Sequence, residues 1–175
     1  APPARSGVDA VEPGLPIAIP ATEDEVAKVV AAAEKAKAEK DGQLMANVLF
    51  TMRERRSDAV VPWIEAGLKS KDTSVLEQAI RAATSHELES HEKAIRKLFS
   101  TYAKKKDKKK KKKKGDDDSP SSSRNVMVAC IAYFGVFAIE GEEKSVQLQL
   151  DDLFKDGATP GSWTGEFLRA ATLYL

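Results

Sequence analysis

Residues 72–99, DTSVLEQAIRAATSHELESHEKAIRKLF, constrain the fold most, because they contain two short amphipathic segments separated by a turn. Apolar side chains recur at helical spacing in both segments, which predicts an apolar stripe along each helix. Helices this short are marginal alone in water, so neighbouring elements must cover both stripes. We expect further copies of the same unit to do so. The stripes comprise Val75, Leu76, Ala79, Ile80 and Ala83, and then Leu88, Ile95, Leu98, Phe99 and Tyr102.

The charge of the chain is divided unevenly. The formal net charge is +1, yet residues 104–118 hold ten lysines and four aspartates, which leaves the remainder acidic. A block of like charges cannot pack into a core, so residues 104–123 are predicted to be a disordered loop. The predicted organisation is a Pro-rich linker or surface strap at 1–21, helical repeats at 22–103, this loop, and further repeats of the same array at 124–175.

Helices are also expected before residue 72. Thr22 and Glu25 form a capping-box pattern, which predicts a helix that begins there. Gly42 follows the helical pattern and is expected to act as its stop. Asp41 and Gly42 are also expected to open a second helix, which finishes in Arg53, Arg55 and Arg56. A third must begin close to Asp58, because Pro62 is tolerated only in the first turn of a helix.

Three more helices are predicted after the loop, at 125–140, 144–156 and 163–175. The longest apolar run, 126–139, has fourteen residues. A membrane span needs roughly 18 or more, so we expect a buried helix and no membrane span. Cys130, the one cysteine, lies in this run and is expected to be a small core residue that forms no intrachain disulfide. No strand with period-two alternation is evident.

The second helices of the predicted pairs end alike, in VVPWIEAGL, EKAIRKLF and VQLQLDDLF. Leu68 and Phe99, the ends of the first two segments, lie 31 residues apart. Phe99 and Phe154 are separated by a similar distance once the lysine-rich insertion is set aside. A period in the low thirties with two helices per unit is typical of a helical solenoid. The sequence therefore predicts an all-α, right-handed α-solenoid of about three antiparallel helix pairs.

The segment DTSVLEQAIRAAT…EKAIRKLF resembles a HEAT-type repeat, a member of the armadillo-like superhelices in which an Asp-led turn opens the first helix. SDAVVPWIEAGLKSKDTSV, with its early Pro62, is similar to the second helix of that family. The resemblance covers residues 41–99 and, more loosely, 124–175, where the proline is absent. It implies a binding scaffold and carries no catalytic residues with it.

One stretch of the sequence is similar to a metal-binding motif. His86 and His91 lie in HELESHE, which invites comparison with the HExxH zinc motif. They are five residues apart, or about 140° around a helix axis, which is unsuitable for joint ligation. The chain has no phosphate-binding glycine loop and no GxSxG motif. We therefore expect a non-enzymatic protein with no cofactor and no metal.

Two groups of residues are candidates for contact with a protein partner. Arg53, Arg55 and Arg56 end a predicted helix, where they either complement its dipole or form an anion site. Trp63 lies at the edge of an apolar stripe and is expected to pack in the core, with a partner anchor as the alternative. The predicted binding face is formed by the second helices, at residues 58–69, 88–102 and 144–155.

The alternative to a protein scaffold is a helical protein that binds nucleic acid or an anionic membrane surface. A lysine cluster that neutralises phosphates gives salt-sensitive affinity that does not depend on sequence. No aromatic residue is interleaved and residues 116–118 are acidic, so a merely solvated loop is the other interpretation. The candidate polyanion contacts are Lys104, Lys105, Lys106, Lys108, Lys109, Lys110, Lys111, Lys112, Lys113 and Lys114.

The two ends of the sequence give one expectation each. The chain begins at Ala1 without a methionine, so the compartment is left open between cytoplasmic and exported after removal of a leader. Residues 163–175 form a predicted helix with no second helix after it and end in the apolar sequence TLYL. This predicts a fragment of a longer array, or an end that docks on another subunit or on the N-terminal strap.

Overall fold

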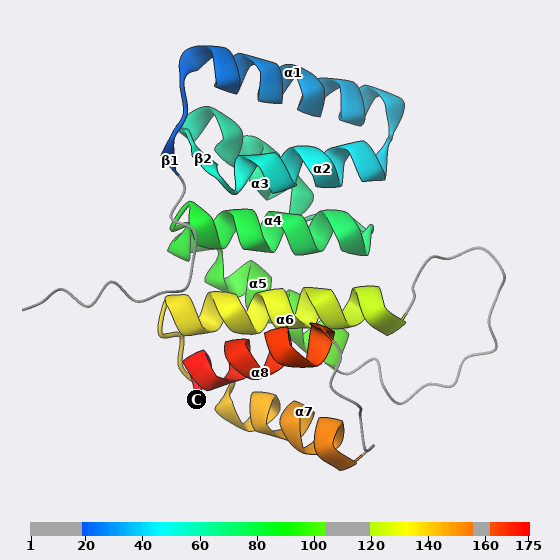
Figure 1. Cartoon of the computed structure of the whole chain (residues 1–175), viewed down its shortest axis with the longest axis vertical. Helices are drawn as coiled ribbons and strands as arrows, with labels where there is room; N and C mark the ends of the chain where they lie inside the picture. The colour runs from blue at the N-terminus through cyan, green and yellow to red at the C-terminus, as the bar shows by residue number, and fades with distance from the viewer. Residues whose placement is uncertain (1–18, 104–119, 156–161) are drawn as a thin grey trace, which may run out of the picture.

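The computed structural model describes residues 19–103, 120–155 and 162–175, and this described part is mostly helical (Figure 1). The all-α prediction is confirmed. Most of the predicted N-terminal strap and most of the predicted lysine-rich loop lie outside the described residues. The helices are α1 (Glu23–Glu39), α2 (Gly42–Met52), α3 (Val61–Gly67), α4 (Thr73–Ser85), α5 (Glu92–Ala103), α6 (Pro120–Val136), α7 (Glu143–Lys155) and α8 (Ser162–Tyr174).

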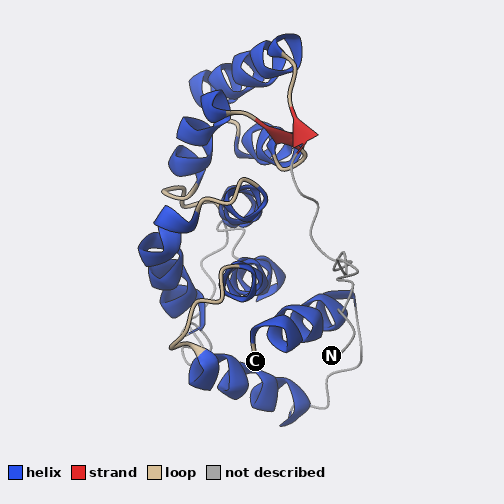
Figure 2. Cartoon of the chain, turned by 90° about the vertical axis from the view of Figure 1, so that its left-hand side faces the viewer, coloured by secondary structure: helices blue, strands red, loops and turns tan. Residues whose placement is uncertain are grey.

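The helices form two layers. Figure 1 shows α2, α4 and α6 lying one below the other, with α1 at one end and α8 beside α6. Figure 2 shows α3, α5 and α7 along the outer side of a C-shaped arrangement, while α2, α4, α6 and α8 line its inner side. Each inner helix packs against the next, and α3 and α5 pack against the inner helices that follow them. The side chains that face the interior of the C therefore come mainly from the inner layer.

Local capping signals begin the helices where the sequence predicts. The Thr22 side chain accepts a hydrogen bond from the Glu25 backbone N–H, and the Glu25 carboxylate accepts one from the Thr22 N–H, which completes the predicted capping box. Asp41 caps α2 and Asp72 caps α4 in the same way, through side-chain oxygens that accept backbone N–H groups. Ser57 caps the 3₁₀ turn that leads into α3. The N-terminus of each of these helices is therefore determined by residues within the next turn of the chain.

Two helix ends differ from the prediction. Helix α1 is ended by Lys40, which takes the left-handed conformation with φ 53°, so Gly42 is not the stop but the first residue of α2. Helix α6 begins at Pro120, inside the stretch predicted to be loop, because proline suits the first turn of a helix. It ends at Val136, earlier than predicted, and Ala138 just beyond it has φ 49°.

A short parallel pair of strands was not predicted. β1 (Ile19–Pro20) runs beside β2 (Arg55–Arg56). The backbone N–H groups on either side of Pro20 donate to carbonyls of residues 54 and 56 at 3.0 Å. Because α2 ends at Met52 and the chain is extended at β2, the prediction that this helix finishes in Arg55 and Arg56 is wrong.

Helix α6 is buried on nearly all sides. Residues 126–131, Tyr133 and Phe134 are each at most 4% exposed, because α4 and α8 flank the helix and α5 packs behind it. The prediction of a buried helix is confirmed, and burial raises the pKa of the Cys130 thiol. In the described part of the chain no helix is both long and apolar enough to cross a membrane. Helix α1, at the end of the array, buries only Ala33 and Ala36.

Candidate functional site

The three arginines predicted as a group contact different parts of the molecule. Arg55 lies 3.2 Å from the Glu25 carboxylate on α1, and Arg56 lies 2.6 Å from the Glu87 carboxylate after α4. Arg53 instead caps the C-terminus of α2 and extends toward α4. The structure therefore does not bring the three together. Arg55 and Arg56 tie neighbouring elements, and Arg53 is set apart from both.

Arg53 has few polar contacts for a half-buried cation. Its Nη1 donates to Oε1 of Gln78 at 3.3 Å, and its Cζ lies 5.2 Å from the centre of the Phe50 ring. Its Nε is buried without a hydrogen-bond partner among the described residues. Burial, and then the nearby Arg81 cation, lower the pKa of the Arg53 guanidinium. A desolvated charge without an anionic partner is unfavourable.

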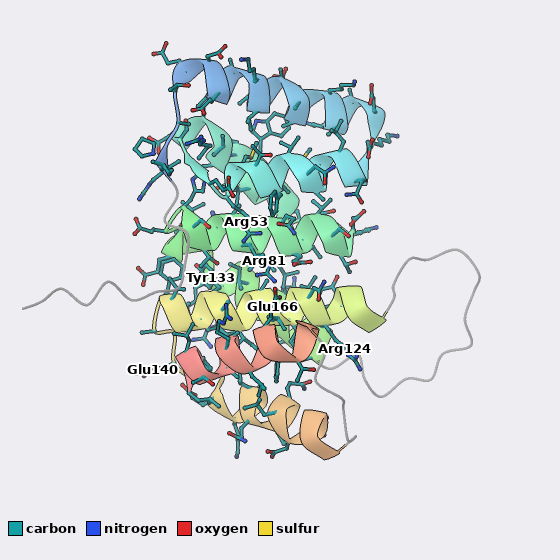
Figure 3. All side chains as sticks on the ribbon, viewed as in Figure 1. Arg53, Arg81, Arg124, Tyr133, Glu140 and Glu166 are labelled. Carbon is teal, nitrogen blue, oxygen red and sulfur yellow. The ribbon has the colours of Figure 1, made fainter. Side chains whose placement is uncertain are left out.

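Arg81 on α4 is the neighbouring cation, and it is well compensated. Its Nε lies 3.0 Å from the Glu77 carboxylate one turn earlier on the same helix. Its Nη2 lies 3.1 Å from the carboxylate of Glu166, so that the pair joins α4 to α8 across α6. Figure 3 shows Arg53, Arg81 and Glu166 in a column on the inner layer.

We call this group of residues the inner-face cluster. Phe50 belongs to it and is 51% exposed, although it stands beside a half-buried arginine. The cluster thus combines an open aromatic ring, a half-buried cation without an ion pair, and the network of Arg81 with Glu77 and Glu166, which carries one excess negative charge. Its members are Phe50, Arg53, Glu77, Gln78, Arg81 and Glu166.

A second charged cluster, around Arg96 on α5, was missed by the sequence analysis. Arg96 contacts the Glu92 carboxylate at 2.6 Å and the Glu142 carboxylate at 3.0 Å, and it also donates to the carbonyl of Glu140. Its Cζ lies 5.9 Å from the centre of the Phe134 ring. The hydrogen bonds that Arg96 donates to the Glu92 and Glu142 carboxylates raise its pKa. This arginine ties α5 to the turn between α6 and α7.

Two tyrosine hydroxyls also connect separate elements of the fold through hydrogen bonds. The Tyr133 hydroxyl on α6 contacts the carbonyls of Leu88 at 2.8 Å and Glu89 at 3.0 Å, in the turn before α5. The Tyr174 hydroxyl on α8 accepts a hydrogen bond from the Glu142 backbone N–H at 2.8 Å. Burial raises the pKa of both phenols. A tyrosine inside an apolar run was the signal in the sequence, because a buried hydroxyl needs a partner.

The two histidines do not form a joint site. His86 is buried, and its Nε2–H donates to the carbonyl of Met52 at 2.7 Å, which joins the ends of α2 and α4. His91 lies 3.5 Å from the Glu65 carboxylate. Burial lowers the pKa of His86. Within the described ranges there is no group of three or more side chains arranged to hold a metal ion.

The remaining predicted contact residues lie elsewhere. Trp63 is half-buried against the core, with the Lys37 ammonium 5.9 Å from its ring centre, and its role as a partner anchor stays a prediction. The second helices predicted to form the binding face make up the outer layer in Figure 2. Leu173 and Leu175, near the C-terminus, are 51% and 55% exposed, and self-association there also stays a prediction. The predicted lysine contacts lie outside the described residues.

The chain matches no family model, no curated protein and no solved structure in the three comparisons made. The HEAT-type resemblance therefore stays a prediction, and the functional interpretation rests on the geometry of the inner-face cluster.

Proposed function

We propose that this protein is a non-enzymatic protein-interaction scaffold, an α-solenoid of HEAT-like helix pairs that binds its partner on the inner face. The observation that carries the proposal is the pairing of Phe50, half exposed, with Arg53, a half-buried cation that has no carboxylate partner among the described residues. Aromatic and arginine side chains supply most of the binding energy in protein interfaces when they are packed in this way.

The inner face is a better candidate than the outer face for this role. Phe50 is the one aromatic residue among the strongly exposed large apolar side chains, counted over the residues whose side chains the structure describes. Trp63, on the outer layer, is half-buried and lies beside the Lys37 ammonium. An anchor must be open before binding and become desolvated on binding, and Phe50, which is 51% exposed, is open.

Site-specific photo-crosslinking tests this function. A benzophenone amino acid replaces Phe50 in the full chain, and the matched control carries it at Lys97, an exposed position on α5 in the outer layer. We expect a discrete crosslinked protein from position 50 and none from position 97, and we expect Arg53→Gln to remove the product. The same products from both positions, or none from position 50, would contradict the proposal.

A second candidate function is polyanion binding through the lysine block, which has ten lysines among residues 104–114. Fluorescence anisotropy with labelled DNA at increasing salt tests it, because counterion release makes such binding steeply salt-dependent. The candidate requires that deleting residues 104–118 abolishes binding while circular dichroism shows unchanged helicity. Absence of binding by the intact chain at physiological salt would exclude it.

A further inference from the structure

The position of the Arg53 guanidinium is fixed before any partner arrives. Phe50 lies on one side of it at 5.2 Å, the Gln78 amide oxygen holds Nη1 at 3.3 Å, and Nε is buried. A side chain that is already ordered loses little conformational entropy when it binds a ligand. Arg53 is therefore pre-organised, and part of its surface is exposed for a further contact.

The nearby carboxylates are committed elsewhere. Glu77 and Glu166 both bind Arg81, at 3.0 and 3.1 Å, and neither forms an ion pair with Arg53. The lowered pKa of Arg53 agrees with this lack of an ion pair. Burial and the Arg81 cation lower it, and together they outweigh the attraction of the surrounding glutamates. An incoming anion would thus supply the one partner that the cluster lacks.

The charge of the cluster limits which anion fits. Two arginines and two glutamates sum to zero, and the exposed Glu54 follows Arg53 directly in the chain. Glu54, Glu77 and Glu166 repel any added anion, and they repel a phosphate with nearly two negative charges more strongly than a carboxylate with one. A single carboxylate matches the single unpaired guanidinium and can bind it through charge-assisted hydrogen bonds. The charges therefore favour a peptide carboxylate over a nucleic acid or a phosphopeptide.

Phe50 defines the second requirement. Its ring packs beside the guanidinium and is half exposed, so a ligand that reaches Arg53 also passes the ring. Covering an exposed aromatic ring with an apolar side chain is favourable, and it also removes water from the adjacent ion pair.

From these observations we propose that the partner presents an Asp or Glu carboxylate to Arg53, next to an apolar side chain that covers Phe50. This inference rests on the proposed scaffold function and specifies its partner as an acidic, partly apolar peptide segment. The occupant is another protein, and the segment lies along the inner layer across α2 and α4.

Phage display of random linear peptides on the immobilised full chain tests this inference. We expect enriched peptides with Asp or Glu close to Leu, Ile or Phe. In fluorescence anisotropy, synthetic copies should lose about tenfold or more in affinity for the Arg53→Gln and Phe50→Ala chains. Replacing the peptide's Glu with Gln should have a similar effect. The matched control, Lys28→Gln, removes an exposed cation on α1 that is already paired with Asp24, and this chain should bind as the wild type does.

The outcomes separate the inference from the function on which it rests. Enriched peptides that lack a carboxylate, or whose affinity is unchanged in Arg53→Gln, would overturn the inference. If Phe50→Ala still weakened those peptides, the scaffold function would stand. If the wild-type chain enriched no peptide relative to a chain that carries both Arg53→Gln and Phe50→Ala, that result would overturn the inference and remove its support for the scaffold function. Circular dichroism of each variant establishes that the chain is folded.

Discussion

Arg96 and Arg53 occupy comparable positions but have opposite environments. Each is half-buried on or next to a helix, and each lies beside an aromatic ring, Phe134 or Phe50, at 5.9 and 5.2 Å. Arg96 binds two carboxylates and a backbone carbonyl, and its pKa is raised. Arg53 binds one amide oxygen, and its pKa is lowered.

The difference indicates what each arginine does. Hydrogen bonds to charged groups stabilise a fold when both partners are satisfied, and this is the case for Arg96. A cation left with an unpaired buried nitrogen contributes little to stability, and such groups persist where function requires them. Arg96 therefore connects elements of the fold, and substitutions can separate this role from the binding role proposed for Arg53.

The largest effect on stability is expected for Arg96→Met. The change leaves the Glu142 carboxylate, whose side chain is 16% exposed, without its cation. We expect the free energy of unfolding to fall by about 2–3 kcal/mol in urea titrations. Lys97→Met, at the next and exposed position, is the control and should change it by less than about 0.5 kcal/mol. Equal effects of the two substitutions would contradict the proposal that the contacts of Arg96 stabilise the fold.

The second-largest effect on stability is expected at acidic pH, where protonation of His86 weakens the contact between the ends of α2 and α4. Because burial lowers the pKa of His86 below its usual value of 6.5, the folded protein holds the neutral imidazole. The contribution of neutral His86 to the free energy of unfolding is complete above pH 6.5. It is lost as the pH falls through the lower pKa that His86 has in the folded protein. The slope should reach at most about 1.4 kcal/mol per pH unit. A His86→Gln chain with the wild-type slope in pH-dependent urea unfolding would contradict this prediction.

Tyr133→Phe should have a smaller effect than either. The ring stays in place, and only the hydroxyl that contacts the carbonyls of Leu88 and Glu89 is lost. We expect a loss of about 1 kcal/mol, measured by thermal and urea unfolding. A change within about 0.3 kcal/mol of zero would show that water satisfies these carbonyls equally well.

The smallest change in stability is expected for Arg53→Met. The apolar side chain keeps the stem and removes the buried Nε that has no partner. We expect the free energy of unfolding to change by less than about 0.5 kcal/mol, or to rise, while partner crosslinking at position 50 is lost. Destabilisation as large as that of Arg96→Met would erase the distinction between the two arginines.

The sequence predicts features that depend on local chemistry. Thr22, Asp41 and Asp72 cap their helices as expected, because an N-cap needs only the next turn of chain. The arginine group was recognised, but its geometry was not, because the strand pairing of residues 19–20 with 55–56 directs the chain after α2. The long-range ties were missed for the same reason, since Arg96 and Glu142 are separated by 46 positions.

Helix α6 shows how neighbours limit such predictions. Its apolar run was recognised, yet its start at Pro120 was assigned to the loop, because charge and serine content dominated that stretch. Pro120 suits the first turn of a helix, and α4, α5 and α8 then cover the apolar run that follows. The inner-face cluster likewise combines residues from three helices, and no spacing in the sequence brings Arg53, Gln78 and Glu166 together.

The burial of α6 has a consequence for synthesis of the chain. One flank of this helix is covered by α8, which begins only at Ser162. Helix α6 therefore leaves the ribosome before α8 does, and until α8 has emerged the apolar side chains on that flank of α6 are exposed to other chains. Docking of α8 on α6 is thus a late step, and it is the interval in which aggregation competes with folding.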